Sequence, residues 1–337
     1  MIGQRYSRIV RLPDIGEANF ERISQARVAL VGCGTLGGVL GINLVRLGVG
    51  SLRLIDRDIA EDHNLSAQIF FDEEDVRQIL PKAIAAQRHL EAINSACRIE
   101  ARVNDLTGNS AESLLGGVDL ILDGTDNFEA RFIINDAALK LGIPWIYCGA
   151  VGYGGTTLAV VPGKTACLRC LMDSPPDSIE EPTCETAGVW PPAAQSAAAV
   201  ALTEASRILT GRAPSGKLWE LDFEALQWRG IPAPRRKDCP ACVRGEFSHL
   251  RGDLGLQAVK MCGRDMVHLH PAQARPVDLI ALAKRLKPFG EISMNEFLLR
   301  LRTPEAEIFL FGDGRAFVKG VSDPARARAL FHRYIGP

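Results

Sequence analysis

The sequence predicts an α/β protein with a doubly wound, mostly parallel mixed sheet of the Rossmann type. Apolar strand-like segments alternate with helix-like segments through about the first 150 residues. The stretch VALVGCGTLGG, residues 28–38, breaks into glycines where a strand passes into a helix. After about Gly152 the alternation gives way to paired strands. Such alternation implies parallel strands with helices on both faces of the sheet.

The alternation can be followed along the chain. RVALVG (27–32) predicts a buried strand, TLGGVLGINLVRLG (35–48) a helix, and SLRLID (51–56) a second strand, which together form a βαβ unit. We then expect a helix at about 81–94, strands at 98–103 and 118–126, a helix at 128–141, and a strand at 143–151.

The later segments have a different pattern. TTLAVVPG (156–163) and KLWELDFEALQWRGI (217–231) predict antiparallel strands, and an alanine-rich helix lies between them at about 193–209. The last segment contains a helix at 277–286, a hairpin at 307–320 turning at Asp313–Gly314, and a closing helix from about 322. We therefore expect two domains, 1–250 and a small α+β module at 251–337.

Composition and charge narrow the range of functions. Lys and Arg number 39 against 40 Asp and Glu, which gives a net charge of −1. No global basic field is available to bind nucleic acid or an anionic membrane, so neither is expected as a partner. No apolar run approaches the roughly 20 residues of a membrane span, and the N-terminal MIGQRYSRIV lacks the apolar core of a signal peptide. We expect a cytoplasmic protein.

The glycine-rich stretch indicates a nucleotide site. Gly32, Gly34 and Gly37 let the backbone turn tightly and approach a phosphate, and the helix that follows presents free amides and its positive dipole end. Asp56 ends the next strand, where a carboxylate can accept hydrogen bonds from both ribose hydroxyls. This arrangement serves NAD and ATP equally well.

Two CxxC pairs predict a metal site. Nine cysteines in a chain of this kind favour reduced thiols over a disulfide framework. Each CxxC pair presents two thiolates from a tight turn, and four thiolates complete the tetrahedral sphere that zinc prefers. The zinc would be structural and would clamp the segment after the sheet onto the later antiparallel strands. The predicted ligands are Cys167, Cys170, Cys239 and Cys242.

Lys82 and Asp126 favour ATP over NAD. Lys82 falls in the first turn of a predicted helix, and Asp126 lies just past the carboxyl end of a predicted strand, where a doubly wound sheet forms its ligand crevice. A lysine for phosphate charge and a carboxylate for Mg²⁺ are what nucleotidyl transfer needs, whereas hydride transfer needs neither. A helix lysine without such neighbours is usually a solvated surface charge.

Several ordered segments carry a resemblance to a known family. They are RYSRI (5–9), GCGTLG (32–37), DRD (56–58), NLSAQ (64–68), PKA (81–83), DGTDN (123–127), CETAGV (184–189) and the two CxxC pairs. Over about residues 5–244 the chain resembles the ThiF/MoeB/HesA group, which is related to the ubiquitin-activating enzymes. The tail, from FGDGRAF onward, is similar to an extension in some bacterial members.

The resemblance implies an ATP-dependent adenylyltransferase that forms a homodimer. Its partner would be a small ubiquitin-like sulfur carrier of the ThiS or MoaD type ending in Gly-Gly, in thiamine or molybdopterin biosynthesis. The glycine carboxylate of the carrier would attack the α-phosphate of ATP, pyrophosphate would leave, and an acyl-adenylate would remain for sulfur transfer. Which carrier and which pathway stay open.

The resemblance also implies individual roles. The glycines around Gly34 cradle the nucleotide, Asp56 binds ribose, and Asn64 and Lys82 meet the phosphates. Arg8 crosses to the active site of the partner subunit. Further nucleotide contacts come from Gln68, from Asp126 as the Mg²⁺ ligand, and from the adjacent Asn127.

Cys184 has two open interpretations. ThiF-like members use a cysteine in this motif as a partner of the activated carrier, whereas MoeB-like members do not require it. Its neighbours here include Glu180, Glu181 and Glu185, which should raise the pKa of a thiol. The sequence leaves both roles open.

Ala67 departs from the family pattern, in which NLSAQ usually has an arginine at this position. Loss of one phosphate-neutralising contact commonly costs on the order of 10²–10³ in rate. Ala67 could be engineered, or a natural change compensated by a cation such as Arg57, Arg77 or Arg131. The chain could also be a scaffold that binds ATP and a ubiquitin-like protein without chemistry. An NAD-dependent oxidoreductase is a further alternative, but it leaves the CxxC pairs, Lys82 and Asp126 unexplained.

Overall fold

The computed structural model describes residues 4–175, 184–251, 257–260, 265–271 and 276–336, with the backbone alone for 184, 185 and 257–260. The chain divides into two compact units, Met1–Gly252 and Asp253–Pro337. Each unit contains one sheet. The functions expected from the sequence for the two domains stay predictions.

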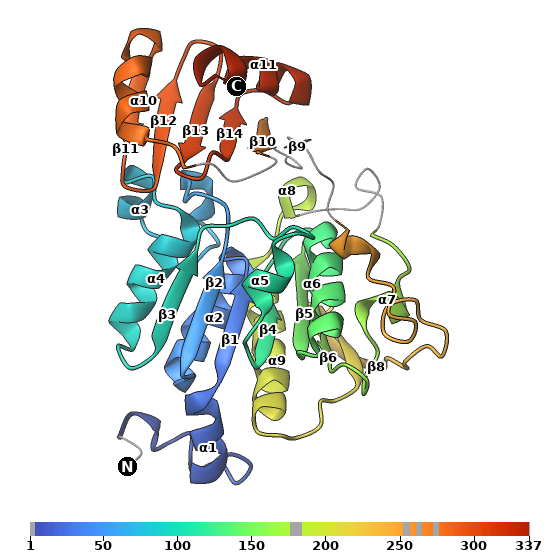
Figure 1. Cartoon of the computed structure of the whole chain (residues 1–337). Coiled ribbons are helices and arrows are strands. Elements are labelled where there is room, and N and C mark those ends of the chain that lie inside the picture. The colour runs from blue at the N-terminus through green and yellow to red at the C-terminus, as the bar shows by residue number, and fades with distance from the viewer. Residues whose placement is uncertain (1–3, 176–183, 252–256, 261–264, 272–275, 337) are drawn as a thin grey trace. The chain divides into compact units, whose positions relative to one another are not determined.

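The first unit is built on an eight-stranded sheet with the strand order β3-β2-β1-β4-β5-β6-β7-β8 (Figure 1). Strands β1 to β5 are parallel, and β6 to β8 continue the sheet in antiparallel pairs, which confirms the mixed Rossmann-like fold. The bounds are β1 Arg27–Val31, β2 Ser51–Ile55, β3 Arg98–Arg102, β4 Leu120–Asp123, β5 Trp145–Val151, β6 Gly154–Val160, β7 Lys217–Asp222 and β8 Gln227–Pro232.

Helices cover both faces of this sheet. Helices α2, α4 and α9 lie on one face, and α5 and α6 lie on the other (Figure 1). The continuous burial of β4 on both sides follows from this double cover. The bounds are η1 Gln4–Tyr6, α1 Gly16–Gln25, α2 Thr35–Leu47, η2 Asp62–Asn64, α3 Glu73–Arg77, α4 Lys82–Ile93, α5 Ala111–Leu115, α6 Phe128–Leu141, α7 Leu168–Leu171, α8 Cys184–Ala187, α9 Pro191–Leu209 and η3 Ser248–Leu250.

Local chemistry explains why α6 and α9 begin and end where they do. Asn127 caps α6 by accepting a hydrogen bond from the Ala130 N–H over 2.8 Å, and Gly142 ends the helix in the left-handed conformation at φ 69°. Helix α9 begins at Pro191, two residues before the expected start, because proline suits the first turn of a helix. Its alanines allow close packing, and a Cβ at Gly155 of β6 would lie 3.0 Å from the Ala197 Cβ.

The register aligns the carboxyl ends of the central strands. Val31 is paired with Ile55 on one side and with Asp123 on the other. The segments that follow β1, β2 and β4 therefore begin at one level of the sheet edge. From β1 the chain continues to β2 on one side of β1, and it later forms β4 on the other side. The position between β1 and β4 is therefore the topological switch point, where sheets of this kind bind ligands.

The second unit contains an antiparallel sheet with the order β11-β12-β13-β14-β10-β9 and its own apolar core. The predicted hairpin is present as β13 and β14, and both predicted helices form. Strands β9 to β12 were not expected from the sequence, because each is only four or five residues long. The bounds are β9 Gln257–Lys260, β10 Met266–His270, α10 Leu279–Leu286, η4 Lys287–Phe289, β11 Glu291–Met294, β12 Leu298–Arg302, β13 Glu307–Phe311, β14 Ala316–Lys319 and α11 Pro324–Tyr334.

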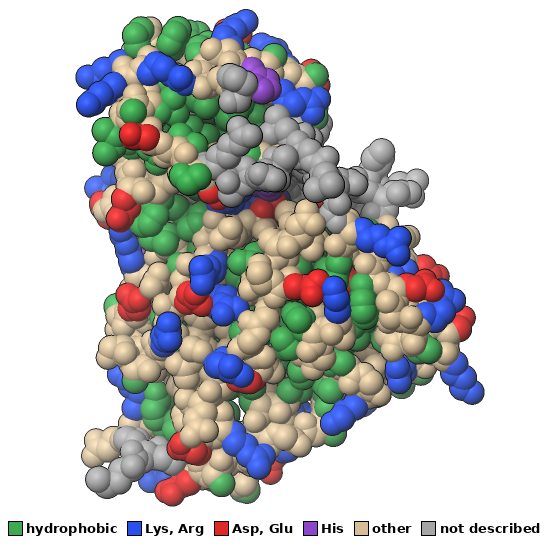
Figure 2. Space-filling model, viewed as in Figure 1, with side chains coloured by type: hydrophobic (Ala, Val, Ile, Leu, Met, Phe, Trp, Pro, Cys, Tyr) green, Lys and Arg blue, Asp and Glu red, His purple; other side chains and the backbone are tan. Residues whose placement is uncertain are grey.

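The surface carries both signs of charge. On the face shown in Figure 2, the basic side chains of the first unit are interspersed with acidic ones. Among the helices of the described residues, none combines the length and the apolar character needed to cross a membrane.

Candidate nucleotide and metal sites

The glycine loop between β1 and α2 is constrained by its own packing. Gly32 has φ 87°, and a Cβ there would lie 2.6 Å from the Gly124 carbonyl oxygen in the loop after β4. A Cβ at Gly37 would lie 2.0 Å from the Gly32 oxygen. Both positions therefore require glycine. A Cβ at Gly34 would meet nothing closer than Nε2 of Gln68 at 3.8 Å, so this space is one that a ligand could use.

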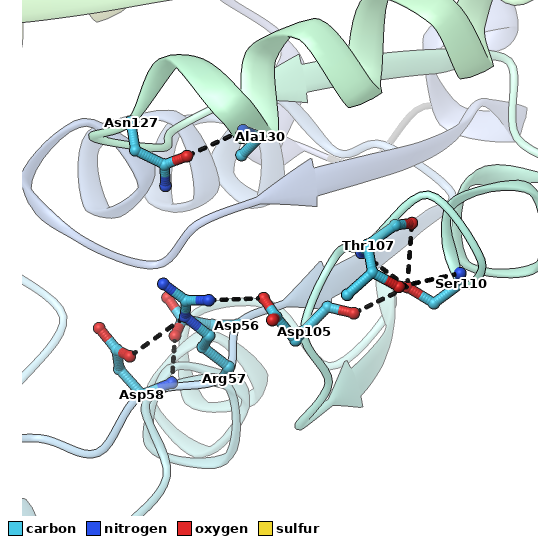
Figure 3. Close-up of polar contacts among 8 residues, drawn as sticks. All are labelled: Asp56, Arg57, Asp58, Asp105, Thr107, Ser110, Asn127 and Ala130. Carbon is cyan, nitrogen blue, oxygen red and sulfur yellow. Dashed lines mark hydrogen bonds and ion pairs between the residues drawn. The ribbon is translucent and has the colours of Figure 1, made fainter. Parts of the chain in front are cut away.

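Asp56 directly follows β2 and is tied to the glycine loop. Its Oδ2 accepts the backbone N–H of Cys33 over 2.7 Å. Its Oδ1 accepts the N–H of Asp58 over 2.7 Å (Figure 3). Burial, followed by the charge of Asp58, raises the pKa of Asp56 from 3.8 to about 6. Lys82 and the two N–H donors oppose this rise in pKa. The carboxylate is therefore positioned and charged above pH 6, as a ribose ligand must be.

Lys82 is buried beside this aspartate pair. It is the first residue of α4 and is only 3% exposed, unlike a surface lysine. Its Nζ lies 3.5 Å from Oδ2 of Asp58, and its N–H donates to the Asp58 carbonyl over 2.8 Å. Its charge also lowers the pKa of Asp56. The structure thus brings Lys82, Asp56 and the glycine loop together.

The NLSAQ segment lies over the same loop. Asn64 is buried at 3% exposure, and its Oδ1 accepts the Glu61 N–H over 3.0 Å. Gln68 faces Gly34, and its buried Oε1 has no hydrogen-bond partner among the described residues. An orphaned buried oxygen is costly unless a ligand completes it. Ala67 lies between them and is partly exposed.

Asp126 and Asn127 follow β4 at the start of α6. Asp126 is exposed, as a carboxylate that binds Mg²⁺ from solution would need to be. Its charge contributes to raising the pKa of both Arg57 and Arg131. The side-chain oxygen of Asn127 is engaged as the α6 cap, and its role in nucleotide binding stays a prediction.

A buried ion pair that was not expected from the sequence supports the Asp126 loop. Arg131 Nε lies 3.2 Å from Oδ2 of Asp123, and Arg131 Nη2 donates to the Thr125 carbonyl over 2.8 Å. Oδ1 of Asp123 accepts both the N–H and the hydroxyl of Thr125. The two charges hold the residue just before Asp126. The only sequence signal was an arginine five residues after Asp126, one helical turn into α6.

The three cations considered as substitutes for the missing arginine lie in different settings. Arg131 is committed to Asp123. Arg77 is exposed and pairs with Glu74 over 2.7 Å. Arg57 lies at the ends of β2 and β3, where its Nη1 meets Oδ1 of Asp105 over 2.9 Å.

The four predicted metal ligands form one cluster. The Sγ–Sγ distances are 3.9 Å for Cys167–Cys170, 3.6 Å for Cys167–Cys239 and 3.6 Å for Cys170–Cys242. Zn–S bonds of about 2.3 Å in a tetrahedron place the sulfurs about 3.8 Å apart, so the cluster fits zinc. The backbone N–H of Arg236 points at the Cys170 sulfur over 3.4 Å. Such N–H donors support a bound thiolate.

Helix α6 connects this cluster to the nucleotide edge. Asn135, which is fully buried, accepts the N–H of Leu168, inside the first CxxC pair, over 2.9 Å. The next residue, Asp136, accepts the N–H of His249 over 3.1 Å. Helix α6 begins just after Asp126, and about two turns further along it is bonded to the first CxxC segment.

Arg8 is not brought to the glycine loop of its own chain. The Tyr6 ring packs against Gly48, at the end of α2 opposite the glycine loop, and α2 is about 20 Å long at 1.5 Å per residue. Arg8 is exposed on the same arm. Cys184 begins α8, but its side chain lies outside the described residues.

Comparison with known proteins identifies the family. A sequence model of the ThiF family matches residues 6–241. The chain belongs to the ThiF family.

Among curated relatives, the ThiS adenylyltransferase of Bacillus subtilis is 38% identical over 335 residues, which cover 98% of this chain and 99% of that protein. The Escherichia coli ThiS adenylyltransferase is 35% identical over 241 residues, or 71% of this chain and 94% of that protein. Among solved structures, Escherichia coli MccB with succinimide has a TM-score of 0.62 at 22% identity, covering 71% of this chain and 74% of that one. The last likeness supports the fold alone.

Proposed function

We propose that this ThiF-family chain is an ATP-dependent adenylyltransferase that activates the C-terminal glycine carboxylate of a small ubiquitin-like sulfur carrier. The observation that carries the proposal is the burial of Lys82 against Asp58 and Asp56 at the glycine-loop edge. A buried lysine at this position supplies a fixed positive charge for phosphates, which a dehydrogenase site does not need. The similarity to ThiS adenylyltransferases along nearly the whole chain favours a carrier of the ThiS type over the MoaD type.

The reaction joins two anions. The carrier carboxylate oxygen forms a bond to the α-phosphorus of ATP, the bond to the β-phosphate oxygen breaks, and pyrophosphate leaves with the electron pair. The acyl-adenylate is then ready for sulfur transfer. Catalysis comes chiefly from fixed charges and dipoles that stabilise the crowded phosphorus centre. Lys82 and the free amides at the start of α2 supply these, and Asp56 fixes the ribose.

Two metal ions belong to the proposal. Zinc, held by Cys167, Cys170, Cys239 and Cys242, would be structural because the four thiolates fill its coordination sphere. Mg²⁺ would neutralise phosphate charge when bound, and the exposed Asp126 would hold it. The Asp123–Arg131 pair keeps the Asp126 loop in place.

A homodimer is also proposed. The N-terminal arm carries Arg8 away from the glycine loop of its own chain, so a second copy is needed if Arg8 contacts a nucleotide. Cys184 would take part in sulfur transfer in a ThiF-like route and not in a MoeB-like one. We place the reaction in the cytoplasm, where ATP is available.

The test is ATP–pyrophosphate exchange with a ThiS-type carrier. Exchange should require the carrier and its terminal glycine, and Lys82→Met should lower the rate on the order of 10²-fold. Lys140→Met is the matched control, since Lys140 is an exposed lysine paired with Glu112. Carrier-independent exchange, or binding of NADH in preference to ATP, would overturn the proposal.

A further inference from the structure

The strand order places the parts of a bound nucleotide along one edge of the sheet. The glycine loop follows β1 and Asp126 follows β4, so the phosphates belong between these strands. Asp56, the proposed ribose ligand, follows β2. Adjacent strands are about 4.8 Å apart, and the next strand outward is β3. With the phosphates on one side of Asp56, the base must extend toward the ends of β2 and β3.

Arg57 and Asp105 occupy this position. Ile55 at the end of β2 pairs with Arg102 at the end of β3, so the two following segments start at the same level. Arg57 Nη1 meets Oδ1 of Asp105 over 2.9 Å, and Arg57 Nε lies 3.8 Å from Oδ1 of Asp58 (Figure 3). The Arg57 side chain is 25% exposed, so part of this side chain is open to a ligand.

The support beneath this ion pair is rigid. The Ser110 hydroxyl donates to the Asp105 carbonyl over 2.8 Å and accepts the Thr107 N–H over 2.9 Å (Figure 3). Leu106, between them, is buried at 8% exposure. The loop that carries Asp105 is therefore fixed by its own hydrogen bonds, and Asp105 fixes the guanidinium. Little side-chain entropy remains to be lost when a ligand covers Arg57.

We propose that the Arg57 guanidinium, held by Asp105, is the surface on which the base of the bound nucleotide stacks. A guanidinium is planar, weakly hydrated and stacks on nucleobases, whereas a lysine ammonium lacks a plane. Arg57 is then a binding residue for adenine, and Asp105 a positioning residue. This inference rests on the proposed function for the identity of the ligand and names the residue that recognises its base.

The test separates base binding from phosphate binding. Calorimetry compares AMP, which has the base, with inorganic tripolyphosphate, which has none. Arg57→Leu should raise the dissociation constant for AMP about tenfold and change that for tripolyphosphate less than about twofold. Arg57→Lys keeps the charge opposite Asp105, so it guards against misfolding, and should lose AMP affinity to a similar extent. Arg27→Leu, at an exposed arginine paired with Asp119, should change neither.

Two outcomes overturn the inference. One is an equal loss of tripolyphosphate affinity in Arg57→Leu, which would place Arg57 at the phosphates. The other is an AMP affinity of Arg57→Lys equal to that of the wild type, which would show that base binding does not need the planar guanidinium. Calorimetry needs no carrier protein. If the protein shows no carrier-dependent exchange but the variants change AMP binding as expected, the adenylyltransferase proposal fails. The inference about Arg57 remains supported in that case.

Discussion

The backbone N–H of Cys33, in the middle of the glycine loop, donates to Oδ2 of Asp56 over 2.7 Å. This bond joins the loop after β1 to the residue after β2. It fixes the carboxylate before a nucleotide arrives. The same residue has a pKa of about 6, because burial and the charge of Asp58 disfavour its ionised form.

Nucleotide affinity should fall as the pH drops through about 6. The ribose hydroxyls donate hydrogen bonds, so binding requires ionised Asp56, and below its pKa each binding event must release a proton. Affinity should then fall by up to about tenfold per pH unit. Calorimetry in buffers of different ionisation enthalpy should detect this release. Asp56→Asn should bind the nucleotide weakly at every pH and should release no proton from residue 56. The nucleotide itself also titrates, but this contribution is the same for both proteins and cancels when they are compared.

The cysteine cluster should bind one zinc per chain. Cys239→Ser should reduce the zinc content to near zero and lower the melting temperature, because structural zinc contributes directly to folding free energy. Metal analysis and thermal unfolding test this. Cys97→Ala is the control, because Cys97 is a buried cysteine outside the cluster, and this variant should bind as much zinc as the wild type. Full zinc content in Cys239→Ser would contradict the assignment.

Arg131→Lys should weaken the response to Mg²⁺. Lysine keeps a charge near Asp123, so the fold is preserved, but it cannot reach Asp123 and the Thr125 carbonyl together. The Mg²⁺ concentration for half-maximal exchange should rise about fivefold, an effect of about 1 kcal/mol on the loop. Arg27→Lys, at an exposed pair with Asp119, is the control. An unchanged Mg²⁺ curve would mean that the pair only stabilises the fold.

Ala67→Arg should raise carrier-dependent pyrophosphate exchange. Ala67 lies between Asn64 and Gln68, and Gln68 faces Gly34, so an arginine there could add a cation near the phosphates. The increase could reach on the order of 10²-fold, and exchange kinetics measure it. A rate that stays equal or falls would show that the present residues already supply the needed charge.

Asn135→Leu should destabilise the first unit. It leaves the Leu168 N–H without its acceptor inside the CxxC segment, at a cost of about 1–3 kcal/mol in the free energy of unfolding. Urea unfolding measures this, and the variant should also lose zinc faster to a chelator. Asn19→Leu, at a partly exposed asparagine whose side chain donates to the nearby Asp14 carbonyl, should cost little. Equal effects of the two changes would argue against the link through α6.

Local patterns in the sequence were sufficient for much of the first unit. The strand before Gly32, the helix at 128–141 and the antiparallel strands near Trp219 and Trp228 all form where periodicity predicts them. The second sheet was largely missed, because β9 to β12 are each only four or five residues long, and so short a run gives no clear periodicity. Helix α1 was missed as well.

The sequence by itself determined the alternation of strands and helices, the glycine turn and the two CxxC turns, because each depends on residues close together in the chain. That the two CxxC pairs meet, 72 residues apart, could be predicted only because four thiolates complete the coordination sphere of one zinc. Only the tertiary structure decided that Lys82 is buried against Asp58, that Arg57 meets Asp105, and that Asn135 binds the CxxC segment. These contacts join residues far apart in the chain. Their geometry depends on strand register and on helix packing across the sheet, and no local periodicity encodes either.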